Sequence, residues 1–258
     1  MKIDTMDFEQ AVIYRSKSEI AGVKPYFVLP NREMADYFDA CGGAPEANLI
    51  NWAAQFLPEF GVFVDIGAHC GTWSNTLGLA RSAFVESFEA QPWLAALTKA
   101  GFALNGLTAH CTNTAISNEI GPVTMRVPLA VNHSTLTASG FDSEGTSLRL
   151  ETGGASIAPN NHVIDEQGFA EIELQATTLD MHWLEPDLIK IDVEGAERQV
   201  LEGARKTINA HRPTILLECW QDERGQDKEE LFKFLSDSLD YRFVQIAGWP
   251  EMYLCEPK

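Results

Sequence analysis

The chain has 258 residues, of which 45% are hydrophobic, and this is enough for one large domain with a substantial core. Its 37 acidic residues outnumber 19 basic ones and give a formal net charge of -18. A field of that sign repels phosphate backbones and anionic lipid surfaces, so the composition predicts neither a nucleic-acid partner nor a membrane partner.

The cysteines and the start of the chain favour a cytoplasmic protein. The five cysteines are scattered and show no CxxC or Cys/His ligand spacing. This pattern is typical of a reducing compartment. Acidic residues interrupt the region where a signal peptide needs a continuous apolar run, and no stretch reaches the roughly 18 apolar residues of a membrane span.

Residues 1–45 are predicted to form an N-terminal extension. They mix short apolar runs with turn residues and close on the Cys-Gly-Gly-Ala-Pro segment at 41–45. From Glu46 onward apolar residues recur at helical spacing until Pro58, which predicts an amphipathic helix. We expect the main domain to occupy residues 46–258.

Strand and helix patterns alternate along that main domain. The run 61–67 is almost entirely apolar and is bounded by glycines, as expected for a strand buried on both faces of a parallel sheet. Similar patterns predict strands at 83–89, 108–112, 171–176, 187–192 and 213–219, helices at 70–80, 92–104, 195–210 and 228–239, and a hairpin from 241–246 and 252–255. The repeated strand-helix units predict an α/β fold with a doubly wound, mostly parallel sheet and a C-terminal antiparallel strand.

The regular alternation fails between about residues 122 and 170. This stretch is rich in Ser, Thr, Gly and Asn, and only 123–127 resembles a strand. Segments of this kind commonly carry function, so we expect an insertion or a substrate-facing lid over about 122–176 that decides acceptor specificity. His133 is a candidate for contact with the substrate.

A glycine turn with a carboxylate before it follows the first predicted strand. Asp65, Gly67 and Gly71 occupy this turn, where glycine lets the backbone approach a ligand closely. Glu89 lies 22 residues after Gly67, at the end of the next strand, where a carboxylate can accept hydrogen bonds from both hydroxyls of a ribose. Glu86 competes for this role, but it lies within the strand and is expected at the surface or the sheet edge.

The spacing of the glycines distinguishes a dinucleotide cofactor from S-adenosylmethionine, both of which contain adenosine. A dinucleotide requires GxGxxG so that its pyrophosphate can lie on a helix N-terminus, whereas this turn reads GxxxG. Asp65 would repel a pyrophosphate and suits the ammonium of a methionine moiety. The turn therefore favours S-adenosylmethionine. An NAD-dependent oxidoreductase and a binding module without turnover remain as alternatives.

A second acidic cluster follows the predicted strand at 187–192. Asp192, Glu194 and Glu197 lie where ligands bind in doubly wound sheets, although helix capping and interaction with the helix dipole explain part of the cluster. Asp192 ends a buried strand and is the first candidate for a catalytic residue, with Glu194 second. No convincing set of metal ligands is visible.

The chain resembles the FkbM-type methyltransferases over about residues 46–218. The resemblance lies in VDIGAHCG, FEAQP, TAIS, TLD and, above all, LIKIDVEGAERQVLEGA followed by RPTILLE, in that order and at similar spacing. It implies a Rossmann-like class I methyltransferase fold, S-adenosylmethionine as donor, and O-methylation of a sugar or a secondary metabolite. The chain departs from the usual family pattern at His69, Cys70 and Ala90.

The resemblance also implies roles for individual residues. The methionine part would lie beside Asp65, Gly67, Ala68 and Gly71, the ribose on Glu89, the adenine beside Asn113 and Ala115, and the methyl group beside Asp192. Methyl transfer is an in-line displacement, so the protein must mainly align the acceptor and remove its proton. The acceptor, a small molecule or a glycan, is not specified by the sequence.

Overall fold

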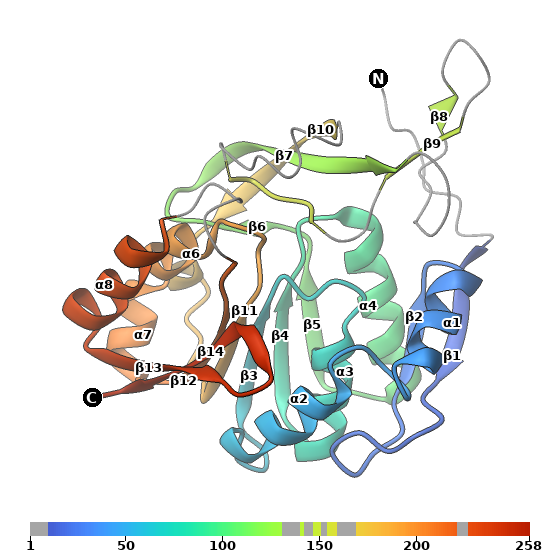
Figure 1. The fold of residues 1–258 in the computed structure, drawn as a ribbon, viewed down its shortest axis with the longest axis horizontal. Helices are drawn as coiled ribbons and strands as arrows, with labels where there is room; N and C mark the ends of the chain where they lie inside the picture. The colour runs from blue at the N-terminus through green and yellow to red at the C-terminus, as the bar shows by residue number, and fades with distance from the viewer. Residues whose placement is uncertain (1–9, 131–139, 142–146, 151–153, 159–168, 221–226) are drawn as a thin grey trace.

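The computed structural model describes residues 10–130, 140–141, 147–150, 154–158, 169–220 and 227–258. Its main sheet has seven strands, namely β3 (Val62–Ile66), β4 (Phe84–Phe88), β5 (Ala109–Thr112), β11 (Leu188–Ile191), β12 (Thr214–Glu218), β13 (Tyr241–Ile246) and β14 (Trp249–Pro257). They follow the order β13-β14-β12-β11-β3-β4-β5 (Figure 1). Strands β12 to β5 are parallel, and β14 is antiparallel to both neighbours. The predicted doubly wound sheet is confirmed.

Helices cover both faces of this sheet. One face packs against α2 (Ala47–Ala53), the short 3-10 helix η2 (Ala54–Phe56), α3 (Thr72–Arg81) and α4 (Pro92–Asn105). The other face packs against α6 (Glu197–Gly203), α7 (Arg205–His211) and α8 (Lys228–Ser238). Neighbouring side chains of a strand point to opposite faces, so Leu188 joins the first core and Ile189 the second. Burial on both faces explains the continuous apolar runs.

The predicted helix at 195–210 is two helices that meet at Ala204. The backbone there departs from helical geometry, with φ -103° and ψ 4°. Val200 and Leu201 before the break and Ile208 after it enter the same core, so the apolar period continues across it. Periodicity therefore gives no sign of the break.

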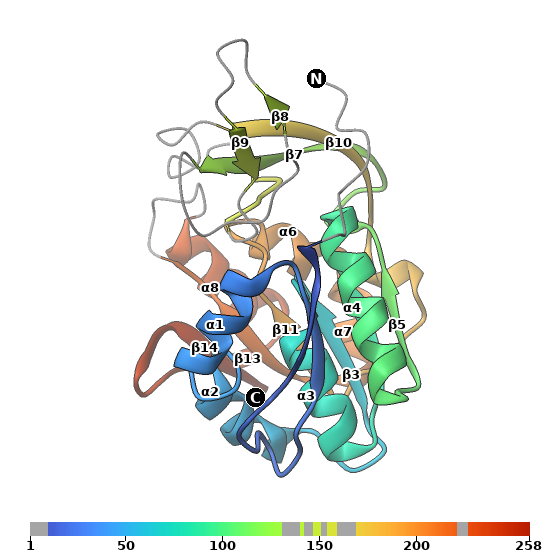
Figure 2. The ribbon, with the colours of Figure 1, turned by 90° about the vertical axis from the view of Figure 1, so that its right-hand side faces the viewer.

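A second sheet lies over the carboxyl ends of the main strands (Figures 1 and 2). Its order is β6-β10-β7-β9-β8, from β6 (Ala115–Ile116), β7 (Gly121–Ala130), β8 (Gly140–Phe141), β9 (Ser147–Leu150) and β10 (Phe169–Thr177). The expectation that 171–176 continues the main alternation is wrong, because β10 pairs antiparallel with β7. Exposed and half-buried residues alternate along most of β10, as in a sheet with one solvated face. His133 lies outside the described residues.

The N-terminal segment folds onto the main domain. Strands β1 (Val12–Arg15) and β2 (Tyr26–Leu29) form an antiparallel pair, followed by α1 (Arg32–Ala40). The side chain of Asn31 caps α1 by accepting a 2.8 Å hydrogen bond from the backbone N–H of Met34. Phe27 is fully buried in the core that contains α3 and α4. The proposed division of the chain at residue 45 stays a prediction.

Among the helices that the structure describes, none combines the length and the apolar character needed to cross a membrane.

Candidate active site

Two adjoining cavities open at the carboxyl ends of β3, β4 and β11. The first has a volume of about 250 Å³ and the second about 290 Å³. Gly67, His69 and Asp192 line both cavities, so these residues form the junction between them. Ligands of doubly wound sheets bind at this edge, which makes the pair of cavities the candidate site.

The glycine turn, residues 67–71, brings β3 into direct contact with the end of β11. Gly67 has φ +81°, and a Cβ there would lie only 1.8 Å from the backbone oxygen of Asp192. No other residue type fits so close an approach. Gly71, with φ +76°, precedes the first turn of α3. The glycines thus hold the turn against Asp192 and shape both cavities.

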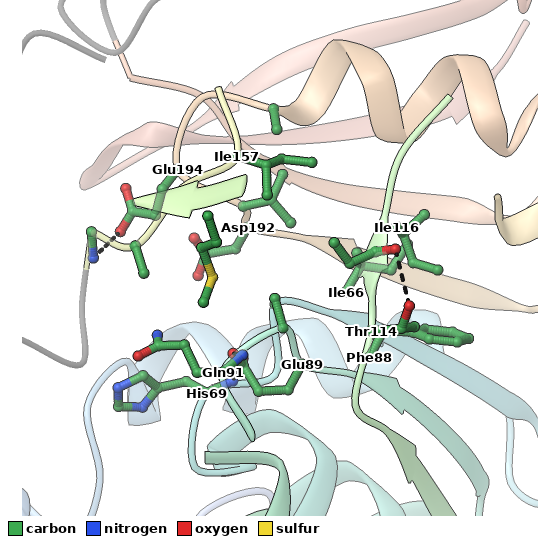
Figure 3. A pocket seen from close by; sticks show the side chains of 18 residues that line it. Ile66, His69, Phe88, Glu89, Gln91, Thr114, Ile116, Ile157, Asp192 and Glu194 are labelled. Atoms are coloured by element: carbon green, nitrogen blue, oxygen red, sulfur yellow. Dashed lines mark hydrogen bonds between the residues drawn. The ribbon is translucent and has the colours of Figure 1, made fainter. Parts of the chain in front are cut away.

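Glu89 enters the first cavity from the end of β4 (Figure 3). Its Oε2 accepts a 2.7 Å hydrogen bond from the backbone N–H of His69, and its Oε1 accepts a 2.8 Å bond from that of Gln91. A carboxylate offers about four acceptor positions, so both oxygens can still accept from a ligand. Burial, opposed by these two backbone bonds, raises the pKa of Glu89 to about 7. The geometry fits a ribose diol.

Glu86 does not compete for this position. It lines neither cavity, and its oxygens lie 3.3 Å from His110 Nδ1 and 3.2 Å from Thr112 Oγ1 on the neighbouring strand. The expectation of a position at the surface or the sheet edge is wrong, since Glu86 is buried on β4, which lies between β3 and β5. Strand β5 covers it in the sheet.

The rest of the first cavity is mostly apolar. Phe88 comes from the main sheet, Ile116 and Met125 come from the second sheet, and Ile157 comes from the segment beside it. This wall suits the flat face of a purine. Asn113 stands behind it, where its Nδ2 donates to the backbone oxygens of Glu89 and Ala90 at 2.8 and 2.9 Å.

Asp192 lies in a buried network of charges. Lys190, only 3% exposed, donates to Asp192 Oδ2 at 2.9 Å, and its Nζ lies 3.9 Å from Asp65 Oδ1. Burial acts to raise the pKa of Asp192, but Lys190 and a hydrogen bond from Glu218 outweigh it and lower this pKa. Burial and the Asp192 charge raise the pKa of Glu218. Glu218 therefore holds the proton, and Asp192 stays ionised.

Glu194 lines the first cavity from the opposite side to Glu89 (Figure 3). Its backbone adopts φ +57°, and its Oε1 accepts a 3.1 Å bond from the N–H of Gly154. Oxygens of Asp192, Glu194 and Glu218 lie within 4.8 Å of one another and could together ligate a cation. Sequence reasoning found no such grouping, because Glu218 is the last residue of a different strand, β12.

The sequence-predicted site residues fall into two groups. Gly67, Ala68, Glu89, Ala115, Asp192 and Glu194 line one or both cavities. Asp65 and Gly71, like Asn113, lie behind the lining. Asp65 is fully buried and accepts a 2.5 Å hydrogen bond from Ser74 Oγ. The individual roles assigned to all of these residues stay predictions.

Several lining residues escaped the sequence reading. His69, which the sequence marked only as a departure from the family pattern, is partly buried at the junction, and burial lowers its pKa to about 4. In the second cavity Trp73 Nε1 donates to Glu46 Oε2 at 2.7 Å. Helix α1 completes its wall with Met34, Tyr37 and Phe38. Only the position of Trp73, two residues after Gly71, offered a signal.

This sheet order, with a glycine turn after the first core strand and a buried carboxylate after the second, defines a class I methyltransferase fold. The model of the methyltransferase FkbM domain matches residues 65–243, and the chain belongs to this family. Its class is that of the methyltransferases, and the cofactor of the class is S-adenosylmethionine.

Solved structures resemble the chain only distantly. Methyltransferase FkbM from Methylobacillus flagellatus is 18% identical with a TM-score of 0.48, over 78% of this chain and 44% of that one. The Pyrococcus abyssi tRNA (uracil-54, C5)-methyltransferase in complex with S-adenosyl-L-homocysteine is 11% identical, with a TM-score of 0.44 over 96% and 44%. A TehB-like methyltransferase from Corynebacterium glutamicum is 12% identical, with a TM-score of 0.45 over 86% and 93%. The chain thus spans less than half the length of the first two proteins. No curated protein matches it significantly.

Proposed function

We propose that the chain transfers the methyl group of S-adenosylmethionine to a hydroxyl oxygen of a small-molecule or glycan acceptor. The observation that carries this proposal is the meeting of Glu89 and the glycine turn in one cavity, where the Glu89 carboxylate keeps acceptor positions for a diol. The apolar Phe88 and Ile116 beside it would hold the adenine. The glycine turn would hold the amino-acid end.

When bound, S-adenosylmethionine would supply a methyl carbon on positively charged sulfur, and the C–S bonding pair would stay on sulfur as the acceptor oxygen bonds to that carbon. The chain's own task is positioning and removal of the hydroxyl proton. Asp192 lines both cavities and is ionised, so it can accept a hydrogen bond from the acceptor hydroxyl and take its proton. Because its pKa is low, orientation is the larger part of its role.

Glu194 is the second candidate for this role. One of its oxygens already binds Gly154, so Glu194 serves better to hold that segment over the first cavity.

We place the reaction in the cytoplasm. All five cysteines are free in the structure, which supports a reducing compartment.

Two experiments test the proposed function. Calorimetry should give heat and a 1:1 stoichiometry with S-adenosylhomocysteine, and no heat with NAD. Labelled S-adenosylmethionine, incubated with the protein and a cell extract, should then yield a labelled O-methyl product that mass spectrometry identifies. Heat with NAD alone would favour the oxidoreductase alternative, and cofactor binding without any transfer would favour a binding module.

A further inference from the structure

We propose that the methyl acceptor binds in the second cavity, against residues 34–46, as a neutral or cationic hydroxylated molecule. This inference rests on the proposed function and extends it, because it assigns the acceptor to a site and to a chemical class. It also gives the N-terminal segment a part in acceptor specificity, beside the insertion at 122–176.

The junction between the cavities provides the geometry for transfer. Gly67, His69 and Asp192 line both cavities, so a ligand in the first faces a ligand in the second across these residues. With the ribose on Glu89, the sulfur, which is one carbon away from the sugar ring, would lie within reach of this junction. An acceptor hydroxyl in the second cavity would then meet the methyl group beside the Asp192 carboxylate.

The second cavity has room for a second molecule. Its volume is about 290 Å³, comparable to the roughly 250 Å³ of the first cavity, which would hold the nucleoside. A short amino-acid tail does not fill such a space. Tyr37 is 53% exposed at its wall, which gives a route from solvent.

Glu46 adopts a strained backbone at the start of α2. It has φ +57°, a conformation that non-glycine residues rarely adopt, and its side chain makes no capping bond to the helix. Instead its Oε2 accepts from Trp73 Nε1, which holds the carboxylate beside the indole in the cavity wall. Strain of this kind is typical of residues retained for a site. Glu46 Oε1 can accept from a ligand hydroxyl or ammonium.

The charges around the second cavity disfavour an anionic acceptor. Glu46 and Asp192 line it and Asp65 lies behind, while Lys190 is the one lysine or arginine among its lining residues in the described part of the chain. The Lys190 ammonium is already bonded to Asp192. Phosphorylated or carboxylated acceptors would meet three carboxyl groups and one lysine, whereas polyols and amines would find hydrogen-bond acceptors.

The described residues of the insertion do not reach this cavity. Met125 and the segment at 154–157 line the first cavity, and no described residue between 122 and 176 lines the second. Met34, Tyr37 and Glu46 do, and they lie outside the span 65–243 that the family model matches. The acceptor wall thus comes from a part of the chain that the family pattern does not cover.

The test compares cofactor binding with methyl transfer in a variant that fills the second cavity. In Met34→Trp the new indole would occupy acceptor space, and the milder Glu46→Gln removes one negative charge but can still accept from Trp73. Ile13→Trp is the matched control, because Ile13 is 63% exposed on β1 and lines neither cavity. Calorimetry measures binding of S-adenosylhomocysteine and of methylthioadenosine, which lacks the amino-acid tail. Labelled donor with cell extract measures transfer.

We expect Met34→Trp to bind S-adenosylhomocysteine within about threefold of the wild type, a difference of less than 1 kcal/mol, and to lose most of the labelled product. Glu46→Gln should lower transfer with the same cofactor affinity. If Met34→Trp weakens S-adenosylhomocysteine strongly and methylthioadenosine little, the cavity holds the tail and the inference is wrong. Unchanged transfer would also overturn it. Failure of the wild type to bind either compound would instead refute the proposed function.

Discussion

The main sheet and the second sheet contribute different chemistry to the same cavity. The main sheet supplies the polar groups, Glu89 and Asp192, from turns that follow buried parallel strands. The second sheet and the segment beside it supply Met125 and Ile157, which are apolar. The difference shows that the polar groups that bind the ligand and the apolar residues that enclose it come from different parts of the molecule. Changes at the ends of the main strands should abolish function, and changes in the apolar residues of the second sheet and the segment beside it should only weaken it.

Asp192→Asn should have the largest effect. The Asn amide oxygen can still accept a hydrogen bond but cannot take the proton of the acceptor hydroxyl, and we expect turnover to fall at least about 100-fold. Affinity for S-adenosylhomocysteine should stay within a few-fold in calorimetry. Because Lys190 loses its partner at 2.9 Å, thermal unfolding must be measured on the same sample. Glu194→Gln, at the second candidate, should lower turnover less, and a folded, active Asp192→Asn enzyme would remove Asp192 from the catalytic role.

Glu89→Gln should weaken the cofactor rather than slow its reaction. A hydrogen bond to a charged group contributes about 1.5–3 kcal/mol, which corresponds to roughly 10- to 150-fold in affinity. The matched control is Glu86→Gln, also buried on β4 but outside both cavities, which should bind normally. Equal affinities of the two variants would show that the ribose does not lie on Glu89.

Cofactor affinity should depend on pH through Glu89. Burial raises the pKa of this carboxyl to about 7, and two ribose hydroxyls can donate only to its ionised form. Affinity should therefore be full above pH 7 and fall by up to about tenfold for each unit below it. The pKa of Glu197 is also raised to about 7, mainly by burial, but Glu197 lines neither cavity. Glu197→Gln should keep the pH dependence and Glu89→Gln should lose it; the reverse would contradict the assignment.

The smallest effect on cofactor affinity is expected for the apolar residues of the second sheet and the segment beside it. Ile157→Val removes one methylene from the wall of the first cavity, worth about 0.8 kcal/mol or roughly fourfold in cofactor affinity. Ile172→Val on β10 lies in the same apolar cluster but lines neither cavity, so it should leave affinity unchanged. An effect of Ile157→Val as large as that of Glu89→Gln would contradict the distinction between polar groups that bind the cofactor and apolar residues that only enclose it.

The main sheet was predictable because its strands are buried on both faces and its turns carry glycines at fixed places. Gly67, Glu89 and Asp192 were found because each directly follows such a strand. The second sheet was missed because its strands pair over long separations and alternate in burial, as β10 does with β7. Glu46 and Lys190 were missed because tertiary contacts, and no local pattern, bring them to the site.

The central claim is that Glu89 and the glycine turn bind one adenosyl cofactor in the first cavity. A crystal structure of the complex with S-adenosylhomocysteine tests it most directly. The claim predicts both ribose hydroxyls within hydrogen-bond distance of the Glu89 carboxylate, with the sulfur at the junction formed by Gly67, His69 and Asp192. A ligand bound elsewhere, or a ribose that makes no contact with Glu89, would contradict it.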